Sequence, residues 1–313
     1  MAVVVATSLE LTSGERDAIL GVGRVRLVEV GGGAPDAALE SAEVWFGPPL
    51  SPAELAQAPR LRWLQAASAG VDQYMARELS EAGVALTSAA GAHGEQAPAH
   101  VFALILALAH RLPTFFARQA GHEWRDETSM SLAGATLLVV GLGAIGRGVA
   151  ALGSAFSMRV LGVRRSGTGL VPGAQRVLPA GQLDGTIGEA DWVVLACPLT
   201  PETRHLVDAR RLGAMRRSAF LVNISRGSVV DEAALVDALR ARRIAGAGLD
   251  VFEEEPLPAS SPLWAMPNVI VTPHVAGSHP SYVSRLMPIF LDNLQRFLTG
   301  APMRNLVDPA RGY

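Results

Sequence analysis

The segment Thr136-Leu137-Leu138-Val139-Val140-Gly141-Leu142-Gly143-Ala144-Ile145-Gly146 decides the fold of this chain of 313 residues. Its first five residues are mostly aliphatic, which predicts a short buried strand. The residues after the glycines predict a helix over 144–156. A strand that passes directly into a helix through a glycine-rich turn is typical of folds in which parallel strands alternate with helices.

The three glycines of this segment form the pattern G-x-G-x-x-G between strand and helix. In this setting Gly141 permits a tight turn, Gly143 lets a pyrophosphate approach the backbone, and Gly146 lets the helix pack against the strand. Ala144 and Ile145 would then offer backbone N–H groups to the anion at the start of the helix. The pattern therefore predicts a dinucleotide site; the alternative is a glycine-rich turn without a ligand.

Strand and helix patterns alternate along the whole chain. In the first third, strand-like runs lie at 3–5, 25–30, 44–46, 61–66 and 84–87. From residue 136 the series restarts, with further runs at 159–163, 192–196, 219–224, 245–249 and 269–271. Two such series predict an α/β protein with two doubly wound parallel-sheet domains.

Three helices are also predicted from their sequences. Ser51 and Glu54 fit a capping box with Pro52 at the first helical position, which predicts a helix at 51–57. The almost wholly apolar stretch 97–112 predicts a core helix, which is also compatible with a buried helix that joins two domains. The stretch 282–300 predicts a helix near the end of the chain.

The composition excludes several classes of function. The chain contains no lysine, so all 27 basic residues are arginine, and this excludes Schiff-base chemistry, lysine-bound pyridoxal phosphate and a P-loop. A net charge of -2 without a basic run argues against nucleic-acid binding. The sequence also lacks an apolar 20-residue run, paired cysteines and an H-E-x-x-H motif, so neither a membrane span nor a metal site is expected. The single Cys197 fits a reducing, cytoplasmic location.

The residues after strand 159–163 indicate which dinucleotide binds. An NAD site usually has an acidic residue about 20 positions beyond the glycines, where it accepts the ribose 2′-OH. Here Arg164, Arg165 and Ser166 follow the strand, and residues 128–183 contain no acid. Two guanidiniums and a hydroxyl suit a 2′-phosphate, which favours NADP(H) over NAD(H). The alternative is that both arginines are solvated loop charges.

Polar segments follow three later strands, where open α/β sheets bind their ligands. These segments are 223–227 (Asn-Ile-Ser-Arg-Gly), 249–258 (Leu-Asp-Val-Phe-Glu-Glu-Glu-Pro-Leu-Pro) and 272–277 (Thr-Pro-His-Val-Ala-Gly). With the glycine-rich turn, and with 68–72 (Ser-Ala-Gly-Val-Asp) and 197–203 (Cys-Pro-Leu-Thr-Pro-Glu-Thr), they occur in the order typical of one family. The chain resembles the D-isomer-specific 2-hydroxyacid dehydrogenases over nearly its whole length.

The resemblance implies catalytic roles for three side chains. Arg226 matches the arginine that holds the substrate carboxylate and polarises its carbonyl, His274 matches the acid/base, and Glu255, before Pro256, matches its carboxylate partner. Hydride delivery to a ketone leaves an alkoxide, which a histidine can protonate near neutral pH. A neighbouring carboxylate favours the charged imidazolium and so keeps the proton available. The structural alternatives are a histidine satisfied within its loop, and an arginine that caps a helix or pairs with Asp231.

Further roles follow from the same resemblance. It places Asp250 near the nicotinamide carboxamide, and we interpret Cys197 as part of the wall of the cofactor pocket. Pro198 and Thr203 belong to the same cofactor-binding segment.

A second set of residues is expected to contact the substrate. The backbone around Ala69, Gly70 and Val71 matches the loop that receives the substrate carboxylate, where Arg226 and His274 would also bind. Trp45 is a candidate for lining the substrate pocket, although aromatic core packing explains it equally well.

The family resemblance also implies how the chain is organised. A Rossmann-type cofactor domain, 99–282, would be inserted into a flavodoxin-like substrate domain made of 1–98 and 283–313, and the protein would form a homodimer. The expected activity is reduction of a small 2-keto acid with NADPH, because Arg-Arg-Ser at 164–166 is similar to the glyoxylate/hydroxypyruvate reductase branch. The alternative is a non-catalytic dinucleotide sensor on the same fold, like the corepressor-like relatives. In the segment 97–100, Ala99 stands where relatives carry a glutamate.

Overall fold

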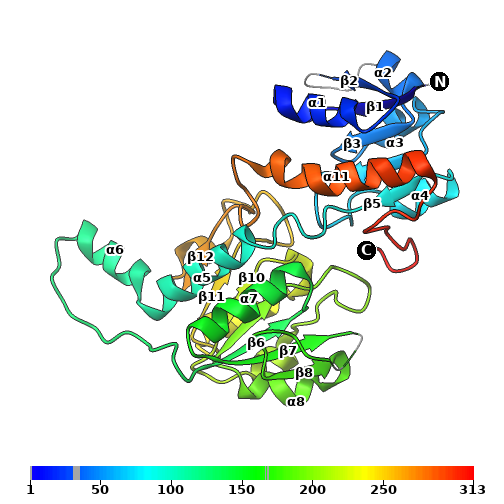
Figure 1. Cartoon of the computed structure of the whole chain (residues 1–313). Helices are drawn as coiled ribbons and strands as arrows, with labels where there is room; N and C mark the ends of the chain where they lie inside the picture. Colours follow the sequence, from blue (N-terminus) through cyan, green and yellow to red (C-terminus); the bar gives the residue numbers. More distant parts are fainter. Residues whose placement is uncertain (1, 31–35, 166, 168) are drawn as a thin grey trace. The chain divides into compact units, whose positions relative to one another are not determined.

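The structure is a computed structural model that describes residues 2–30, 36–165, 167 and 169–313 (Figure 1). The chain divides into two compact units. Unit 1 is made of the N-terminal residues up to Ala92 together with His279–Tyr313, and unit 2 is His93–Ser278. Unit 2 is thus inserted into the sequence of unit 1. The divisions lie at 92/93 and 278/279, and the domain boundaries proposed from the sequence lie at 98/99 and 282/283.

Unit 1 contains a sheet of five parallel strands. The strands are β1 (Val3–Thr7), β2 (Val25–Glu29), β3 (Val44–Gly47), β4 (Trp63–Ala66) and β5 (Ala85–Thr87). Their spatial order, β2-β1-β3-β4-β5, is that of flavodoxin-like folds. The helices are α1 (Ser13–Gly21), α2 (Asp36–Ser41), α3 (Pro52–Ala56), α4 (Ala76–Glu81) and α11 (Tyr282–Thr299). One face of the sheet packs on α1 and α11, and the other packs on α2, α3 and α4.

Unit 2 contains a sheet of seven parallel strands. These are β6 (Thr136–Val140), β7 (Arg159–Arg164), β8 (Arg176–Pro179), β9 (Trp192–Leu195), β10 (Phe220–Asn223), β11 (Gly246–Leu249) and β12 (Val269–Val271). The order β12-β11-β10-β9-β6-β7-β8 reverses direction at β6, as in Rossmann-type sheets. The α-helices are α5 (Gln96–Ala109), α6 (Leu112–Ala120), α7 (Ala144–Ala155), α8 (Leu183–Thr186), α9 (Ala209–Ala214) and α10 (Glu232–Arg240). Short 3-10 turns lie at Ala180–Gln182, Ile187–Glu189, Gly227–Val229 and Pro262–Ala265.

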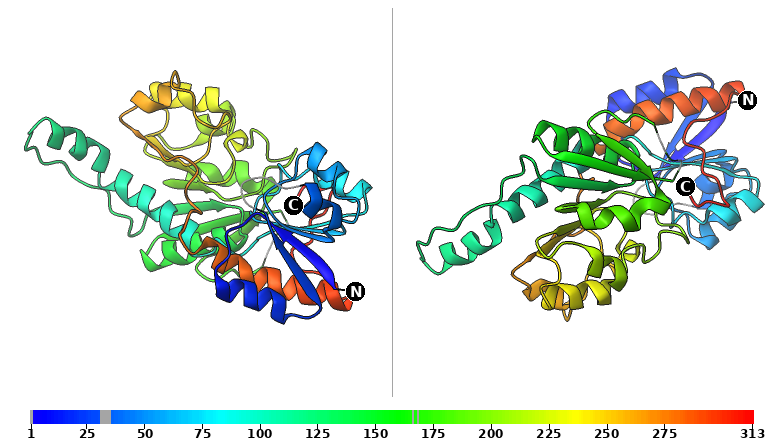
Figure 2. Two further views of the ribbon diagram at one scale, coloured as in Figure 1. Left: turned by 90° about the horizontal axis from the view of Figure 1, so that it is seen from above. Right: turned by 90° about the horizontal axis from the view of Figure 1, so that it is seen from below.

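Both faces of the seven-stranded sheet are buried, which explains the continuous apolar strands. In β6, Leu137 and Val139 pack with α5 and α7, while Leu138 and Val140 pack with α8, α9 and α10. Successive side chains of a strand point to opposite faces, so a strand covered on both sides must be apolar throughout. The layers of helices can be followed in the two views of Figure 2.

Helix ends follow the expected chemistry. The capping box predicted at Ser51 and Glu54 is present at the start of α3, and α11 ends at Gly300 with a left-handed φ of 71°. The single helix predicted over 97–112 was wrong at its end. The structure ends α5 at Ala109, places Arg111 at a φ of 54°, and begins α6 at Leu112.

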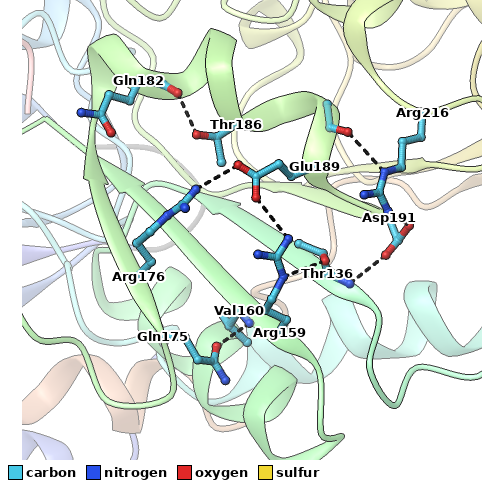
Figure 3. A network of polar contacts seen from close by, with 11 residues as sticks. Thr136, Arg159, Val160, Gln175, Arg176, Gln182, Thr186, Glu189, Asp191 and Arg216 are labelled. Atoms are coloured by element: carbon cyan, nitrogen blue, oxygen red, sulfur yellow. Dashed lines mark hydrogen bonds and ion pairs between the residues drawn. The ribbon is translucent and has the colours of Figure 1, made fainter.

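The sequence did not predict the edge strand β8, because its four residues are only partly buried. Side chains at the start of the strands bind it to the sheet (Figure 3). The Glu189 carboxylate accepts hydrogen bonds from Arg159 of β7, at 3.1 Å, and from Arg176 of β8, at 3.0 Å. These two arginines hold the pKa of Glu189 below its ordinary value. These half-exposed ion pairs add to the backbone pairing of β8 with β7.

Candidate active site and cofactor cradle

The carboxyl ends of the parallel strands in unit 2 bring the predicted polar segments to one edge of the sheet. The glycine-rich turn follows β6, and the segments with Arg226, Asp250 and His274 follow β10, β11 and β12. Because these strands are hydrogen-bonded in parallel register, their last residues lie at the same edge. The side chains that the sequence singled out therefore come from adjacent loops.

The glycine-rich turn has the geometry that its spacing predicts. Gly141 has a φ of 96°, and a Cβ on it would lie 2.6 Å from the backbone of Ala196. A Cβ on Gly146 would lie 1.8 Å from the carbonyl oxygen of Gly141, so α7 packs directly against the turn. Glycine is required at both positions for steric reasons within the protein itself.

Gly143 differs, because nothing among the described residues lies within 4 Å of the place where its Cβ would be. Its φ of -70° is open to any residue. Gly143 precedes the first turn of α7, where the N–H groups of Ala144, Ile145 and Gly146 have no partner within the helix. Open space in front of free N–H groups fits the pyrophosphate of a dinucleotide.

Arg164 and Arg165 lie beside this turn. Val163 pairs with Val140, and the Gly141 N–H donates to the Val163 carbonyl at 2.8 Å, so the end of β7 is adjacent to the glycines. Arg164 is half-buried, and its Nε donates to the Gly167 carbonyl at 2.8 Å. Arg165 is exposed. The third predicted residue, Ser166, lies outside the described part of the chain.

The segment after β9 borders the glycine turn on its other side. The backbone of Cys197 contacts Gly141, and the Thr203 hydroxyl donates to the Pro198 carbonyl at 2.7 Å, which closes the turn. Cys197 is 9% exposed, and burial raises the pKa of its thiol to about 11. The thiol is therefore protonated at neutral pH, which agrees with a pocket wall rather than a nucleophile.

His274 and Glu255 form a close pair. The His274 Nδ1 lies 2.7 Å from Glu255 Oε2, and Glu255 Oε1 accepts the Phe252 N–H at 3.0 Å. A carboxylate accepts only, so Nδ1 carries the hydrogen and Nε2 is left for other partners. Of the three consecutive glutamates, Glu253 instead pairs with His205 at 2.7 Å.

The loop of Arg226 packs against the loop of Glu255. A Cβ on Gly227 would lie 1.8 Å from the Phe252 carbonyl carbon, so only glycine permits this approach. Buried Asn223 orders the Arg226 loop, since its Nδ2 donates to the Arg226 carbonyl at 3.0 Å and its Oδ1 accepts from Ser225 at 2.7 Å. Asn223 and Gly227 were not predicted from the sequence to have roles of their own.

Arg226 is half-buried, and its Nη1 donates to the Ser225 carbonyl at 2.9 Å. Asp231, its alternative partner in the sequence, accepts the Ala234 N–H at 2.9 Å and caps α10. His93 was also overlooked: burial lowers the pKa of His93, and the charges of Arg226 and His274 act in the same direction. Its ring packs against Gly277. A neutral histidine therefore lies close to the predicted catalytic pair.

The predicted substrate loop lies in unit 1, whereas Arg226, Glu255 and His274 lie in unit 2. Ala69 and Gly70 are half-buried and Val71 is buried. The Ser68 hydroxyl donates to the Gly70 carbonyl at 2.6 Å. Tyr74 supports the loop, because its hydroxyl accepts the Ala67 N–H at 3.2 Å.

Trp45 is placed in the core of unit 1. It is 2% exposed, and its Nε1 donates to the Pro48 carbonyl at 2.9 Å. Burial to this extent favours the packing alternative over contact with a substrate. The sequence could not separate the two, because both require an aromatic residue at the end of a strand.

Two further properties bear on the class of protein. Within the described ranges, no group of three or more His, Cys, Asp or Glu side chains could hold a metal ion. No single described helix is long and apolar enough to cross a membrane; α5 and α6 reach that length only as a pair bent by 63°.

Comparison with known proteins identifies the family. Residues 102–276 match the D-isomer specific 2-hydroxyacid dehydrogenase, NAD binding domain. A glyoxylate reductase of Aeropyrum pernix is 38% identical over 266 residues, covering 81% of this chain and 78% of that protein. A glyoxylate/hydroxypyruvate reductase B of Yersinia enterocolitica is 34% identical, covering 87% of this chain and 86% of that protein.

Solved structures agree over the whole chain. A D-isomer specific 2-hydroxyacid dehydrogenase of Xanthobacter autotrophicus Py2, in complex with NADPH and MES, has a TM-score of 0.86 at 33% identity and covers 100% of this chain and 99% of that one. An NADPH-dependent glyoxylate/hydroxypyruvate reductase of Sinorhizobium meliloti, in complex with NADP and sulfate, has a TM-score of 0.83 at 28% identity, covering 99% of this chain and 100% of that one. The chain belongs to the D-isomer-specific 2-hydroxyacid dehydrogenase family and is an NAD(P)-dependent oxidoreductase.

Proposed function

We propose that this protein is a 2-ketoacid reductase that converts a small substrate such as glyoxylate or hydroxypyruvate to the D-2-hydroxy acid with NADPH. The observation that carries the proposal is the 2.7 Å contact between His274 Nδ1 and Glu255, on loops that adjoin the Arg226 loop. The similar glyoxylate and glyoxylate/hydroxypyruvate reductases support the choice of substrate class.

The chemistry assigns one task to each of these residues. Bound nicotinamide supplies the hydride, and the protein supplies position and charge. The Arg226 guanidinium binds the substrate carboxylate and stabilises negative charge that develops on the carbonyl oxygen. Glu255 holds Nδ1–H of His274, so Nε2 holds the proton that passes to the substrate oxygen. The N–H groups at the start of α7 bind the pyrophosphate.

The preference for NADPH rests on the loop after β7. Arg164 and Arg165 follow the strand next to the glycine turn, where an NAD-specific relative would place an acid. Both guanidiniums suit a 2′-phosphate: Arg165 is exposed, and Arg164 also donates to the backbone of its own loop. Arg165 is the better residue to test, because its replacement leaves that loop hydrogen bond in place.

The remaining parts of the proposal concern the substrate loop and the assembly. The backbone of Ala69, Gly70 and Val71 receives the substrate carboxylate, and Asp250 and Cys197 flank the cofactor. The protein is a cytoplasmic homodimer that takes no nucleic acid or membrane partner.

The decisive experiment compares the reduction of glyoxylate and hydroxypyruvate with NADPH and with NADH under identical conditions. We expect turnover with both keto acids and a higher kcat/KM with NADPH. Faster turnover with NADH would support the proposed reaction but refute the role of Arg164 and Arg165 in binding the 2′-phosphate. Tight NADPH binding without reduction of any 2-keto acid in a wider panel would favour the sensor alternative.

A further inference from the structure

The loop that carries His274 has a strained backbone. His274 has a φ of 52°, in the left-handed region that is unfavourable for residues other than glycine. The side chain is also 48% exposed, so packing of the imidazole does not fix it. Strained residues persist where their surroundings over-determine the conformation. The contacts beneath the loop must therefore hold His274 in place.

Asp250 is the centre of these contacts. It is completely buried, and its backbone carbonyl accepts the His274 N–H at 2.8 Å. Its carboxylate accepts the Val275 N–H at 3.0 Å and the Ala276 N–H at 2.8 Å. Asp250 thus binds the N–H of His274 through its backbone carbonyl and the N–H groups of the next two residues through its carboxylate. Its two oxygens are directed at the loop of His274.

Thr272 and His100 extend this arrangement to α5. The Thr272 Oγ1 lies 2.5 Å from Asp250 Oδ1, and the single hydroxyl hydrogen must lie between them because a carboxylate only accepts. The Thr272 oxygen can then only accept from His100 Nε2, which lies 3.1 Å away. Nε2 is also 3.5 Å from Asp250 Oδ1. These contacts assign the Nε2–H tautomer to His100.

We propose that Thr272 and His100 are positioning residues for His274. They act through Asp250, which they orient, and Asp250 fixes the strained loop from which the imidazole projects. His100 is on the helix α5, far from the loop in sequence, so it connects the catalytic loop to a rigid element of unit 2. The inference rests on the proposed function, since it assumes that His274 transfers the proton.

Paired variants test the proposal. Thr272→Val removes the hydroxyl at constant shape, and Thr272→Ser retains it. We expect Thr272→Val to lower kcat about 10- to 100-fold, because displacement of a catalytic group by about 1 Å costs up to that much. Thr272→Ser should remain close to the unaltered protein. Likewise, His100→Gln keeps a hydrogen-bond donor near the position of the His100 Nε2, and its kcat should be higher than that of His100→Leu.

Binding measurements separate positioning from a general structural effect. The Kd for NADPH and the KM for the keto acid should change little in all four variants. Thr299→Val, which removes an exposed hydroxyl from α11 in unit 1, is the control and should leave kcat unchanged. Equal kcat values for Thr272→Val and Thr272→Ser would overturn the proposal, as would a loss of NADPH affinity that matches the loss of kcat.

Amide hydrogen exchange provides a readout that does not depend on turnover. The N–H groups of Val275 and Ala276 should exchange faster in Thr272→Val than in Thr272→Ser. If the unaltered protein reduces no 2-keto acid, the proposed function fails, and the exchange rates still decide the inference. Equal exchange in the two variants would refute the positioning role.

Discussion

His274 has an exposed imidazole, and its backbone is held by hydrogen bonds to Asp250. Glu255 orients the ring through Nδ1, and Asp250 accepts the His274 N–H with its carbonyl and the Val275 and Ala276 N–H groups with its carboxylate, which holds the φ of 52°. A general acid must present one nitrogen to the substrate in a constant direction, and geometry limits its efficiency before its basicity does. The hydrogen bonds of His274 thus lie on Nδ1 and on the backbone, which leaves Nε2 for the proposed proton transfer.

Replacement of the proposed acid/base tests this division of roles. His274→Asn should keep the backbone, because asparagine tolerates the left-handed region, and NADPH affinity should be nearly unchanged. The rate of hydride transfer in single-turnover experiments should fall about 100-fold or more. His122→Asn is a matched control, since His122 is exposed with a φ of 55°. An unchanged rate in His274→Asn would remove His274 from the mechanism.

The proposed contact with the 2′-phosphate can also be tested at a single residue. Arg165→Ala should raise the KM for NADPH about 10-fold or more, the weight of one hydrogen bond to a charged group, and leave the KM for NADH unchanged. Steady-state kinetics with both cofactors provide the measurement. Arg217→Ala removes another exposed guanidinium and should affect neither constant. An equal rise for NADH and NADPH would show that Arg165 does not read the 2′-phosphate.

At the scale of elements, the turn between β6 and α7 gives different tasks to its glycines. Gly141 and Gly146 are required by contacts within the protein, whereas the space in front of Gly143 is open. A strand, a turn and a helix N-terminus can be built without Gly143. We propose that the approach of a ligand, rather than folding, explains glycine at this position.

This difference predicts that one glycine substitution lowers stability and that another lowers NADPH affinity. Gly146→Ala should lower the free energy of unfolding by about 1–3 kcal/mol or more, because its methyl group meets the Gly141 carbonyl. Gly143→Ala should leave Tm unchanged and weaken NADPH binding about 10-fold or more. Thermal unfolding and fluorescence titration measure the two effects. A Gly143→Ala protein with normal NADPH affinity would place the pyrophosphate elsewhere.

At the scale of the whole molecule, the helix α6 bears on the prediction of a homodimer. None of its residues is buried, and it extends away from the sheet of unit 2 (Figures 1 and 2). Phe116 is 62% exposed, and Trp124 in the following segment is completely exposed. Large exposed aromatic side chains are typical of interaction surfaces. We assign this surface to the proposed homodimer.

The assembly can be tested by changing this surface alone. Light scattering should give the mass of a dimer at micromolar concentration, and Phe116→Glu should shift the protein to the monomer, because a buried unpaired charge is costly. Leu170→Glu alters another fully exposed apolar residue and should remain dimeric. A monomeric unaltered protein, or a dimer that survives Phe116→Glu, would contradict the assignment.

The sequence by itself determined the features that depend on local spacing. The alternation of strand and helix patterns, the glycine-rich turn and the capping box at Ser51 and Glu54 all reflect interactions between residues a few positions apart. The order of the polar segments was enough to predict the family, and the resemblance to that family identified Arg226, Glu255 and His274 as candidate catalytic residues. The same local patterns did not predict the weakly buried strand β8 or the break after Ala109.

Only the tertiary structure decided which groups meet. His100 and Thr272 are 172 positions apart, and their contact depends on how α5 packs on the sheet. The burial of Trp45 and the approach of Gly227 to Phe252 likewise depend on neighbours that are distant in sequence. Sequence periodicity records which face of an element is buried, but not which residue of another element covers it. For this reason the chemistry could be predicted from the sequence, while the contacts that hold it in place could not.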